Sequence, residues 1–426
     1  MKRLIIIASL AILAVGCQKT EIQNEVQNQI GFSTETGKMT RAIVNNTQFD
    51  ETQPFAVYAY GWHDQVPNKD AQGNPVALMD NVEIISTNQN DLAAPWKTND
   101  EFTYYWPNDP RTNINFYAYS PSHMTADRNT NVNTTADQKL NDRAVMSHSE
   151  TSGMELTDYV HENMYVDFMV ATPVKGSTYA FPNGTYPASQ PAGVVPMTFN
   201  HQMTQVLFNV TTDKAYPGVT FTVEKITLKN IINTATYTNR NLTSAGTYAN
   251  GTWSSESADE ITSFDSYPIF PATTNNGAPA TEEEKELLSV DTDSDGTIED
   301  SEIASMTTTP VTMIPQQMIK AAIAPVAGQD TYAGKIGYQM FEIVYSIKGT
   351  GVAAEQVVRN IPFFANDAAT TVNWGVNKKI LYTVKIGLQE IQFTPSVAVW
   401  DDGDTESPDT DSSNSNNPGG DYPLAQ

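Results

Sequence analysis

The chain contains the stretch Lys379-Ile-Leu-Tyr-Thr-Val-Lys-Ile-Gly-Leu388. Apolar residues recur at every second position of it, at Ile380, Tyr382, Val384, Ile386 and Leu388. The intervening face carries Lys379, Thr383 and Lys385, and only Leu381 is apolar there. Because successive side chains of a β-strand point to opposite faces, this alternation predicts a half-buried antiparallel strand, with one face on a core and the other in water.

Similar alternation occurs along most of the chain. The segments that fit strands are 55–60, 114–119, 165–170, 206–210, 221–228, 341–347 and 357–363, and Asn, Asp, Gly and Pro gather between them. In a last candidate, Ile391 to Val399, Pro395 cannot donate to a ladder, which predicts an edge strand or a kink. Helical patterns are scarce: Thr281–Leu288 is the main candidate and 137–146 a weaker one. The sequence therefore predicts an all-β fold.

A change in composition divides the chain. Residues 176–196 are the segment richest in Pro and Gly and read as a linker. We therefore predict an N-terminal β domain over 42–175, a linker over 176–193 and a C-terminal β domain over 194–400. After Trp400 the chain is acidic, carries no base and is filled with Ser, Asn, Gly and Pro, so we expect the tail 401–426 to be disordered.

Length and charge limit the classes of function. The 426 residues can form two or three cores. The formal net charge of −25 disfavours nucleic acid and anionic membrane surfaces as partners, and loss of residues 1–41, with five bases and three acids, would make it −27. Cys17 is the single cysteine. The sequence therefore excludes an internal disulfide, a zinc site built from several thiolates, and a cysteine nucleophile elsewhere in the chain.

The first residues have the pattern of an export signal. Lys2 and Arg3 precede an apolar run, Leu4 to Val15, that is too short to span a bilayer. Cys17 directly after Gly16 predicts a signal peptide over 1–16 and a diacylglycerol on the Cys17 thiol, although Ala14 stands where Leu is usual. The alternative is an ordinary signal peptide with a chance cysteine.

A second cut is indicated downstream. The sequence Lys38-Met-Thr-Arg41-Ala42 offers a candidate processing site between Arg41 and Ala42. Residues 17–41 would then form a lipidated propeptide. Its apolar alternation at Ile30 and Phe32 predicts a short strand that is later discarded.

The segment 291–302 fits the twelve-residue EF-hand loop and predicts one bound calcium ion. Gly296 permits the sharp turn at position six, and Thr281–Leu288 would be the entering helix. The exit is atypical, since Ile303–Met306 runs quickly into Thr307-Thr-Thr-Pro310, so that the exiting helix would have at most one turn. The alternative is an acidic loop without a metal; if calcium binds, a weak structural clip in an insertion over 281–306 suits a single hand. The predicted ligands are Asp291, Asp293, Asp295, Thr297, Glu299 and Glu302.

Patterns for catalysis are lacking. The five histidines show no ligand spacing, no serine lies in a Gly-x-Ser-x-Gly elbow, and no phosphate-binding glycine loop is present. We therefore predict that the chain is not an enzyme. Trp62, Trp106 and Trp253 could stack on sugars, although packing in a core is the commoner role of tryptophan.

Several stretches, in this order, resemble the fimbrillin family of Gram-negative anaerobes, the Mfa-like fimbrillins in particular. They are Tyr104–Pro107, Ile114–Pro121, Asp167–Ala171, Val195–Val206, Ile314–Gln316, Trp374–Ile386, Ile391–Phe393 and Val399–Trp400. Their order behind a lipoprotein leader and Thr40-Arg41-Ala42 is specific. The insertion 281–306 and the acidic tail are not part of the resemblance.

The resemblance implies two tandem transthyretin-like β-sandwich domains and a cell-surface fimbrial subunit. It implies export as a lipoprotein to the outer membrane, removal of the leader and an early strand by an arginine-specific protease, and filling of the vacated groove by a strand of another subunit. Mapped here, the scissile bond joins Arg41 to Ala42, and the donor strand lies around Leu388–Trp400. The alternatives are a tip or accessory adhesin for a host surface or glycan, and a calcium-binding surface lipoprotein that binds glycans.

Overall fold

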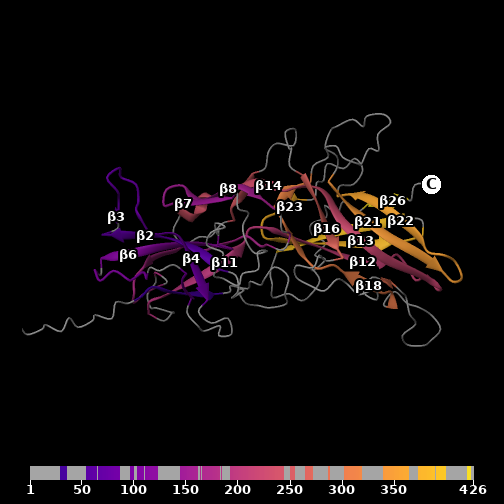
Figure 1. Cartoon of the computed structure of the whole chain (residues 1–426), viewed down its shortest axis with the longest axis horizontal. Coiled ribbons are helices and arrows are strands. Elements are labelled where there is room, and N and C mark those ends of the chain that lie inside the picture. Colours follow the sequence, from indigo (N-terminus) through magenta and orange to yellow (C-terminus); the bar gives the residue numbers. More distant parts are fainter. Residues whose placement is uncertain are drawn as a thin grey trace, which may run out of the picture.

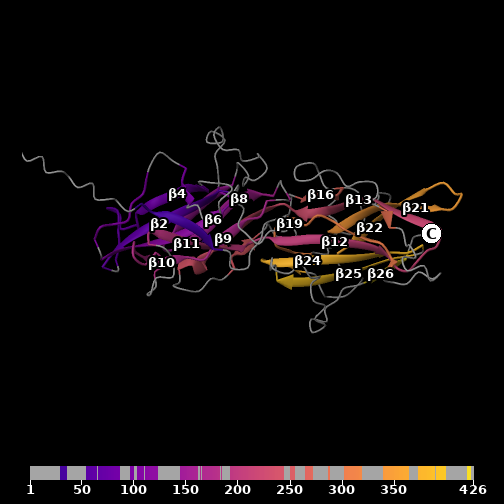
Figure 2. The same cartoon turned by 90° about the horizontal axis from the view of Figure 1, so that it is seen from below.

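The computed structural model describes residues 29–35, 54–86 except 65, 96–122 except 100–102 and 110, 144–184 except 162, 163, 165 and 183, 192–243, 250–254, 264–271, 286–287, 302–318, 339–363, 373–399 except 389, and 420–423. These residues form strands and turns, and none of them forms an α-helix. The all-β prediction is confirmed. Two groups of sheets, the first unit and the second unit, lie end to end along the long axis of the molecule (Figures 1 and 2).

The first unit contains a sheet that closes on itself. Its strand order is β10-β6-β9-β11-β1-β5-β4-β2-β3, and β6 also pairs with β2, so seven strands form a ring. The ring strands are β1 (Gly31–Glu35), β2 (Phe55–His63), β4 (Ala77–Ser86), β5 (Trp96–Thr98), β6 (Thr112–Ser120), β9 (Met169–Ala171) and β11 (Val194–His201), with β3 (Val66–Pro67) and β10 (Val174–Ser177) at the margins. Closure removes the exposed edges of a sheet.

A four-stranded sheet covers the outer face of this ring. It has the order β15-β14-β8-β7 and its apolar side chains pack against those of β2 and β6 that point away from the ring's own core. The strands are β7 (Val145–Ser149), β8 (Gly153–Val160), β14 (Thr234–Asn239) and β15 (Thr252–Ser254). A 3-10 turn, η3 (Arg240–Thr243), follows β14.

The second unit consists of two sheets that share one core. The first contains β12 (Thr204–Thr212), β18 (Ser305–Thr307), β19 (Val311–Met313), β24 (Lys378–Ile386), β25 (Glu390–Val399) and β26 (Gly420–Pro423). The second contains β13 (Val219–Ile232), β16 (Phe264–Phe270), β17 (Glu286–Leu287), β21 (Met340–Gly349) and β22 (Glu355–Pro362). A small pair, β20 (Gln316–Gln317) and β23 (Asn373–Trp374), completes the unit.

The opening stretch forms β24 as predicted, and Ile380, Tyr382, Val384 and Ile386 lie in the core, whereas Leu388 lies beyond the strand and is exposed. Its pairing is mixed, however: β24 is antiparallel to β25 but parallel to β12 along nine residues. The assignment of the sheets to two transthyretin-like sandwiches stays a prediction.

The strand pairing differs from the domain boundaries expected at 175 and 194. β11, expected to begin the second domain, pairs with β9 and β1 of the ring. After β13 the chain returns to the first unit, where β14 pairs with β8. Gly176, within β10 where its register shifts, has a positive φ angle, and so do Gly184 and Gly193 between β10 and β11 of the same sheet. Pro and Gly here serve turns rather than a linker.

Three local predictions are wrong where the structure describes their residues. Glu286 and Leu287, expected in a helix, form β17 on β13, where Leu287 is buried. Val145 and Met146, at the end of the weaker helical candidate, belong to β7. Residues 420–423 of the tail, expected to be disordered, form β26 on β25. In each case pairing with another strand, which is a neighbouring hairpin strand for β7 and a more distant one for β17 and β26, overrides the local pattern.

Candidate functional site

The leader strand β1 is an integral part of the ring. It runs parallel to β11 over five residue pairs, from Gly31 opposite Val194 to Glu35 opposite Thr198. On its other side Phe32 lies opposite Trp96 of β5. Just before the strand, the Ile30 amide donates to the Tyr104 carbonyl at 2.9 Å, and the Gly31 amide donates to the Gly193 carbonyl at 3.0 Å.

The apolar side chains of the leader lie inside the ring. Ile30 is 2% exposed and Phe32 is fully buried. The Phe32 ring makes edge-on contacts with Phe116 and Phe55, at centroid distances of 5.8 and 6.0 Å. Aromatic pairs in this geometry are favourable beyond the area that they bury. The expected short strand therefore exists, and it supplies part of the core.

The position of β1 in the sequence decides what a cut after Arg41 would do. β1 ends at Glu35, six residues before Arg41, and β2 begins at Phe55. Hydrolysis of the Arg41–Ala42 bond would thus separate β1 from every other strand of the ring. Cys17, Arg41 and Ala42 themselves lie outside the described residues.

The predicted donor segment is a strand of its own chain. Leu388–Trp400 contains β25, which is antiparallel to β24 over nine residue pairs. β26 covers its first part, where Phe393 pairs with Gly420, so that the described strand order ends in β26. Pro395 lies beyond the part that β26 covers, in keeping with the expected edge position.

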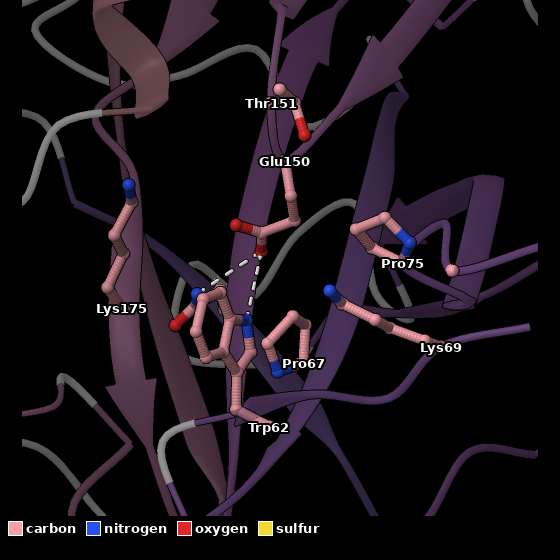
Figure 3. Close-up of a pocket in the computed structure, with 9 residues that line it drawn as sticks. Trp62, Pro67, Lys69, Pro75, Glu150, Thr151 and Lys175 are labelled. Carbon is pink, nitrogen blue, oxygen red and sulfur yellow. Dashed lines mark hydrogen bonds between the residues drawn. The ribbon is translucent and has the colours of Figure 1, made fainter.

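A pocket lies at the end of the first unit (Figure 3). It has a volume of about 390 Å³ and is lined by Trp62, Pro67, Lys69, Gly73, Pro75, Asn115, Glu150, Thr151 and Lys175. The Glu150 carboxylate accepts hydrogen bonds from Trp62 Nε1 at 3.3 Å and from Asn115 Nδ2 at 3.2 Å. Figure 3 shows the Lys69 and Lys175 side chains on opposite sides of this carboxylate.

The sequence model of the fimbrillin-like family matches residues 40–400 of this chain. The chain belongs to the fimbrillin-like family. No functionally curated protein matches it by sequence.

Several solved structures are similar to this fimbrillin-like chain. A candidate cell adhesion protein of Bacteroides uniformis is 14% identical, with 87% of this chain and 98% of that chain covered and a TM-score of 0.40. The tip fimbrial protein Mfa3 of Porphyromonas gingivalis, with C-terminal truncation, is 11% identical, with 82% and 96% covered and a TM-score of 0.29. A fimbrial assembly protein of Parabacteroides distasonis is 10% identical, with 87% and 98% covered and a TM-score of 0.27.

Family membership defines the class of function. Fimbrillins are non-enzymatic structural proteins of the cell surface, so this fimbrillin-like chain is not an enzyme, as the sequence predicts. None of the described residues forms a helix long and apolar enough to cross a membrane.

The predicted calcium loop of the fimbrillin-like chain falls mostly outside the described residues. Of its six ligands only Glu302 is described, half-buried just before β18. The loop leaves β17 on the sheet of β13 and enters β18 on the sheet of β12. It therefore connects the two sheets of the second unit. Among described side chains, no cluster of three or more His, Cys, Asp or Glu could hold a metal ion.

The structure shows which of the three tryptophans that could stack on sugars lines a pocket and which two pack in or against a core. Trp106 is buried, and its Nε1 donates to the Gly193 carbonyl at 3.1 Å. Trp253 packs against Tyr237 and Tyr159, and its Nε1 donates to the Gln202 carbonyl. Trp62 alone of the three lines the pocket. Sequence reasoning missed the partners of Trp62, because they come from four segments that only the pairing of strands and the packing of one sheet on another bring together.

Proposed function

We propose that the chain is a structural subunit of a cell-surface fimbria, exported as a lipoprotein, processed after Arg41 and polymerised by strand exchange. The observation that carries the proposal is β1. A strand encoded before Arg41 closes the ring of the first unit, and its Ile30 and Phe32 lie in the core. In this account the lipid on Cys17 holds the precursor at the outer membrane, and β1 keeps the groove filled until an arginine-specific protease acts.

Loss of β1 would leave a defined acceptor. The edge of β11 would lose its parallel partner, and the ring would open between β11 and β5. An unpaired strand edge next to vacant apolar pockets is the arrangement that binds an added strand, because main-chain hydrogen bonds supply affinity and the pockets select side chains.

The donor that we assign is β25 of another subunit. It carries Ile391 and Phe393, two residues apart, with the same spacing as Ile30, just before β1, and Phe32 of β1. All four side chains are at most 2% exposed in their own sheets. β25 would therefore present the same pair of side chains, at the same spacing, to the pockets that β1 vacates. Exchange between unlike surfaces of successive subunits gives an open filament rather than a closed ring.

Proteolysis with a matched control tests the proposal. A chain that begins at residue 18 is cut with an arginine-specific protease, and size-exclusion chromatography and N-terminal sequencing follow the product. We expect an Ala42 N-terminus together with oligomers, whereas Arg41→Lys keeps the charge, resists the cut and stays monomeric. A chain with an Ala42 N-terminus that remains monomeric at every concentration would contradict the proposal.

A synthetic peptide of residues 388–400 tests the assigned donor without disturbing the fold. We expect it to bind the cut chain and not the Arg41→Lys chain, because only the former can release β1. The matched peptide with Ile391→Ala and Phe393→Ala should bind at least about 100-fold more weakly, since each buried large apolar side chain contributes about 1.5–3 kcal/mol. Equal binding of the two peptides would show that these side chains do not select the donor.

We also propose that 291–302 binds one calcium ion that braces the second unit. Support comes from the loop's place between β17 and β18, because an ion held there would tie strands of both sheets to each other. A ligand that binds only the folded state stabilises it by about 2.7 kcal/mol at 100 times its Kd.

Melting in calcium and in chelator tests this ion. We expect calcium to raise the Tm of the unsubstituted chain by several degrees, and the Asp291→Ala, Glu302→Ala chain to lose that difference. Asp213→Ala, outside the loop, is the control and should keep it. Equal melting of the unsubstituted chain in calcium and in chelator would refute the clip.

A further inference from the structure

We propose that the pocket lined by Trp62, Lys69, Glu150 and Lys175 binds an acidic saccharide, a sugar ring that carries a carboxylate. Polymerisation does not require this site, and ligand binding requires no processing at Arg41. The pocket would give the fimbrial subunit an adhesive function toward host or microbial surface glycans.

One wall of the pocket is a hairpin that its own hydrogen bonds hold in shape. Asp70 Oδ1 accepts from the amides of Gln72 and Asn74 at 2.9 and 2.8 Å, and these bonds hold the pKa of the Asp70 carboxyl below its usual range. Gly73 supplies the positive φ of 88° that the turn requires. Lys69 and Pro75 pair across the hairpin and both face the pocket. Lys69 is therefore presented on a fixed support.

The opposite wall is a network that fixes the Glu150 carboxylate. Asn115 Oδ1 accepts from the Gly176 amide at 2.9 Å, so its Nδ2 points toward Glu150. The Trp62 indole donates to the same carboxylate oxygen and is thereby set in orientation. The Trp62 indole, the Glu150 carboxylate and the Asn115 amide are thus held in fixed positions, and all three line the pocket.

Lys175 completes the pocket from β10. Its ammonium lies over the Tyr117 ring, 5.5 Å from the centroid, and partial burial lowers the pKa of Lys175 whereas the Glu150 charge opposes that shift. Lys69 forms no ion pair with any of the described residues. The pocket thus holds two ammonium groups and one carboxylate on a chain of net charge −25.

The two ammonium groups that line the pocket favour an anionic ligand, and the other lining residues indicate what carries the anion. The face of an indole beside Pro67 and Pro75 is a platform for the C–H bonds of a pyranose ring. Glu150 and Thr151 offer hydrogen-bonding groups for hydroxyls. A volume of about 390 Å³ suits one sugar unit with its substituent. The Glu150 charge disfavours a dianionic phosphate more strongly than a single carboxylate.

Calorimetric titration of the full chain with three small probes tests the ligand class. D-glucuronate supplies both the ring and the charge, D-glucose the ring alone, and acetate the charge alone. We expect glucuronate to bind with a Kd in the millimolar range or below, and each of the other probes to bind at least about tenfold more weakly. Absence of glucuronate binding, or equal binding of glucose, would overturn the proposal.

Charge-removing variants tie any binding to the pocket. Lys69→Gln and Lys175→Gln should each weaken glucuronate binding about tenfold, whereas Lys97→Gln, an exposed β5 lysine outside the pocket, should leave it unchanged. Lys69 is exposed on its hairpin, so its loss should not unfold the chain. Equal losses in Lys69→Gln and Lys97→Gln would contradict the site. A peptide of residues 401–411 that binds there when glucuronate does not would assign the pocket to the tail of a neighbouring subunit instead.

Discussion

At the scale of single residues, Phe32 shows what β1 contributes to the ring of the first unit. Its ring touches Phe55 and Phe116 edge-on and it is fully buried. Burial of such a side chain stabilises a fold by about 1.5–3 kcal/mol, and each edge-on aromatic contact by about a further 0.5–1.5 kcal/mol. When the closed sheet of the first unit loses Phe32, the vacated pocket therefore has a strong preference for another aromatic side chain.

Two buried histidines make stability depend on pH. His148 packs against Tyr117 at a centroid distance of 4.1 Å, and burial lowers the pKa of His148 to about 3. Tyr60 Oη donates to the His148 carbonyl, so His148 Nδ1 carries a hydrogen and donates to Tyr60 Oη. Burial likewise lowers the pKa of His161 to about 4, against the opposing hydrogen bond from its Nε2 to the Thr312 carbonyl.

The sign of the pH effect follows from these shifts. In the unfolded chain both histidines take up protons below about pH 6.5, while in the folded chain they do not until pH 4 or below. The full free energy of unfolding is thus present above about pH 6.5. As the pH decreases below that value, the free energy of unfolding decreases by up to about 1.4 kcal/mol per pH unit for each histidine. Urea unfolding measured from pH 7.5 to 5.0 should show that the free energy of unfolding decreases less in His148→Phe than in the unsubstituted chain. An identical dependence on pH in the two chains would contradict the lowered pKa of His148.

At the scale of elements, the sequence predicts strands well where alternation is long. β2, β6, β12, β13, β21 and β24 all lie over their predicted segments. Predictions that depend on the partner of a strand are weaker. Leu287 follows three glutamates that suit a helix, yet it is buried opposite Phe221. The turn between β10 and β11 has the composition of a linker, and only the pairing of Val194–His201 with β9 shows that it is internal to a sheet.

The site was predictable only in part for the same reason. Ile30 and Phe32 indicate a strand, but nothing local to them shows that it closes a ring between β11 and β5. Trp62 is recognisable as a possible sugar platform. Lys69 and Lys175 meet it only through the pairing of β2 with β3 and β6 and of β6 with β10, and Glu150 meets it only because the β7–β8 sheet packs on β2 and β6.

Two truncations separate the roles of the last strands. Removal of residues 401–426 takes away β26 alone, so the chain should fold and, after the cut at Arg41, should still oligomerise through β25. Removal of 388–426 also takes away Ile391 and Phe393, which are 1% exposed, and should lower the Tm and abolish elongation. Size-exclusion chromatography and thermal melting check both. Loss of elongation in the shorter truncation would assign the donor to β26.

At the scale of the whole molecule, the two units are joined firmly end to end. Thr312 Oγ1 of β19 donates to the carbonyls of Met164 and Val166 at 3.0 and 2.6 Å, and Tyr267 Oη donates to the His161 carbonyl at 2.5 Å. The chain also crosses between the units from β13 to β14. This connection makes a continuous rod, with the ring in one unit and β25 in the other (Figures 1 and 2). Such a subunit suits head-to-tail assembly.

Hydrogen exchange at the backbone amides of β11, Val194–His201, tests most directly whether the leader strand is a removable occupant of the ring. The uncut chain should protect these amides, because β1 and β9 flank the strand. After cleavage at Arg41 and separation of the leader, the monomer should lose protection on the amides that face β1, and the oligomer should regain it. Full protection of β11 in a cut monomer that has lost the leader would contradict the account.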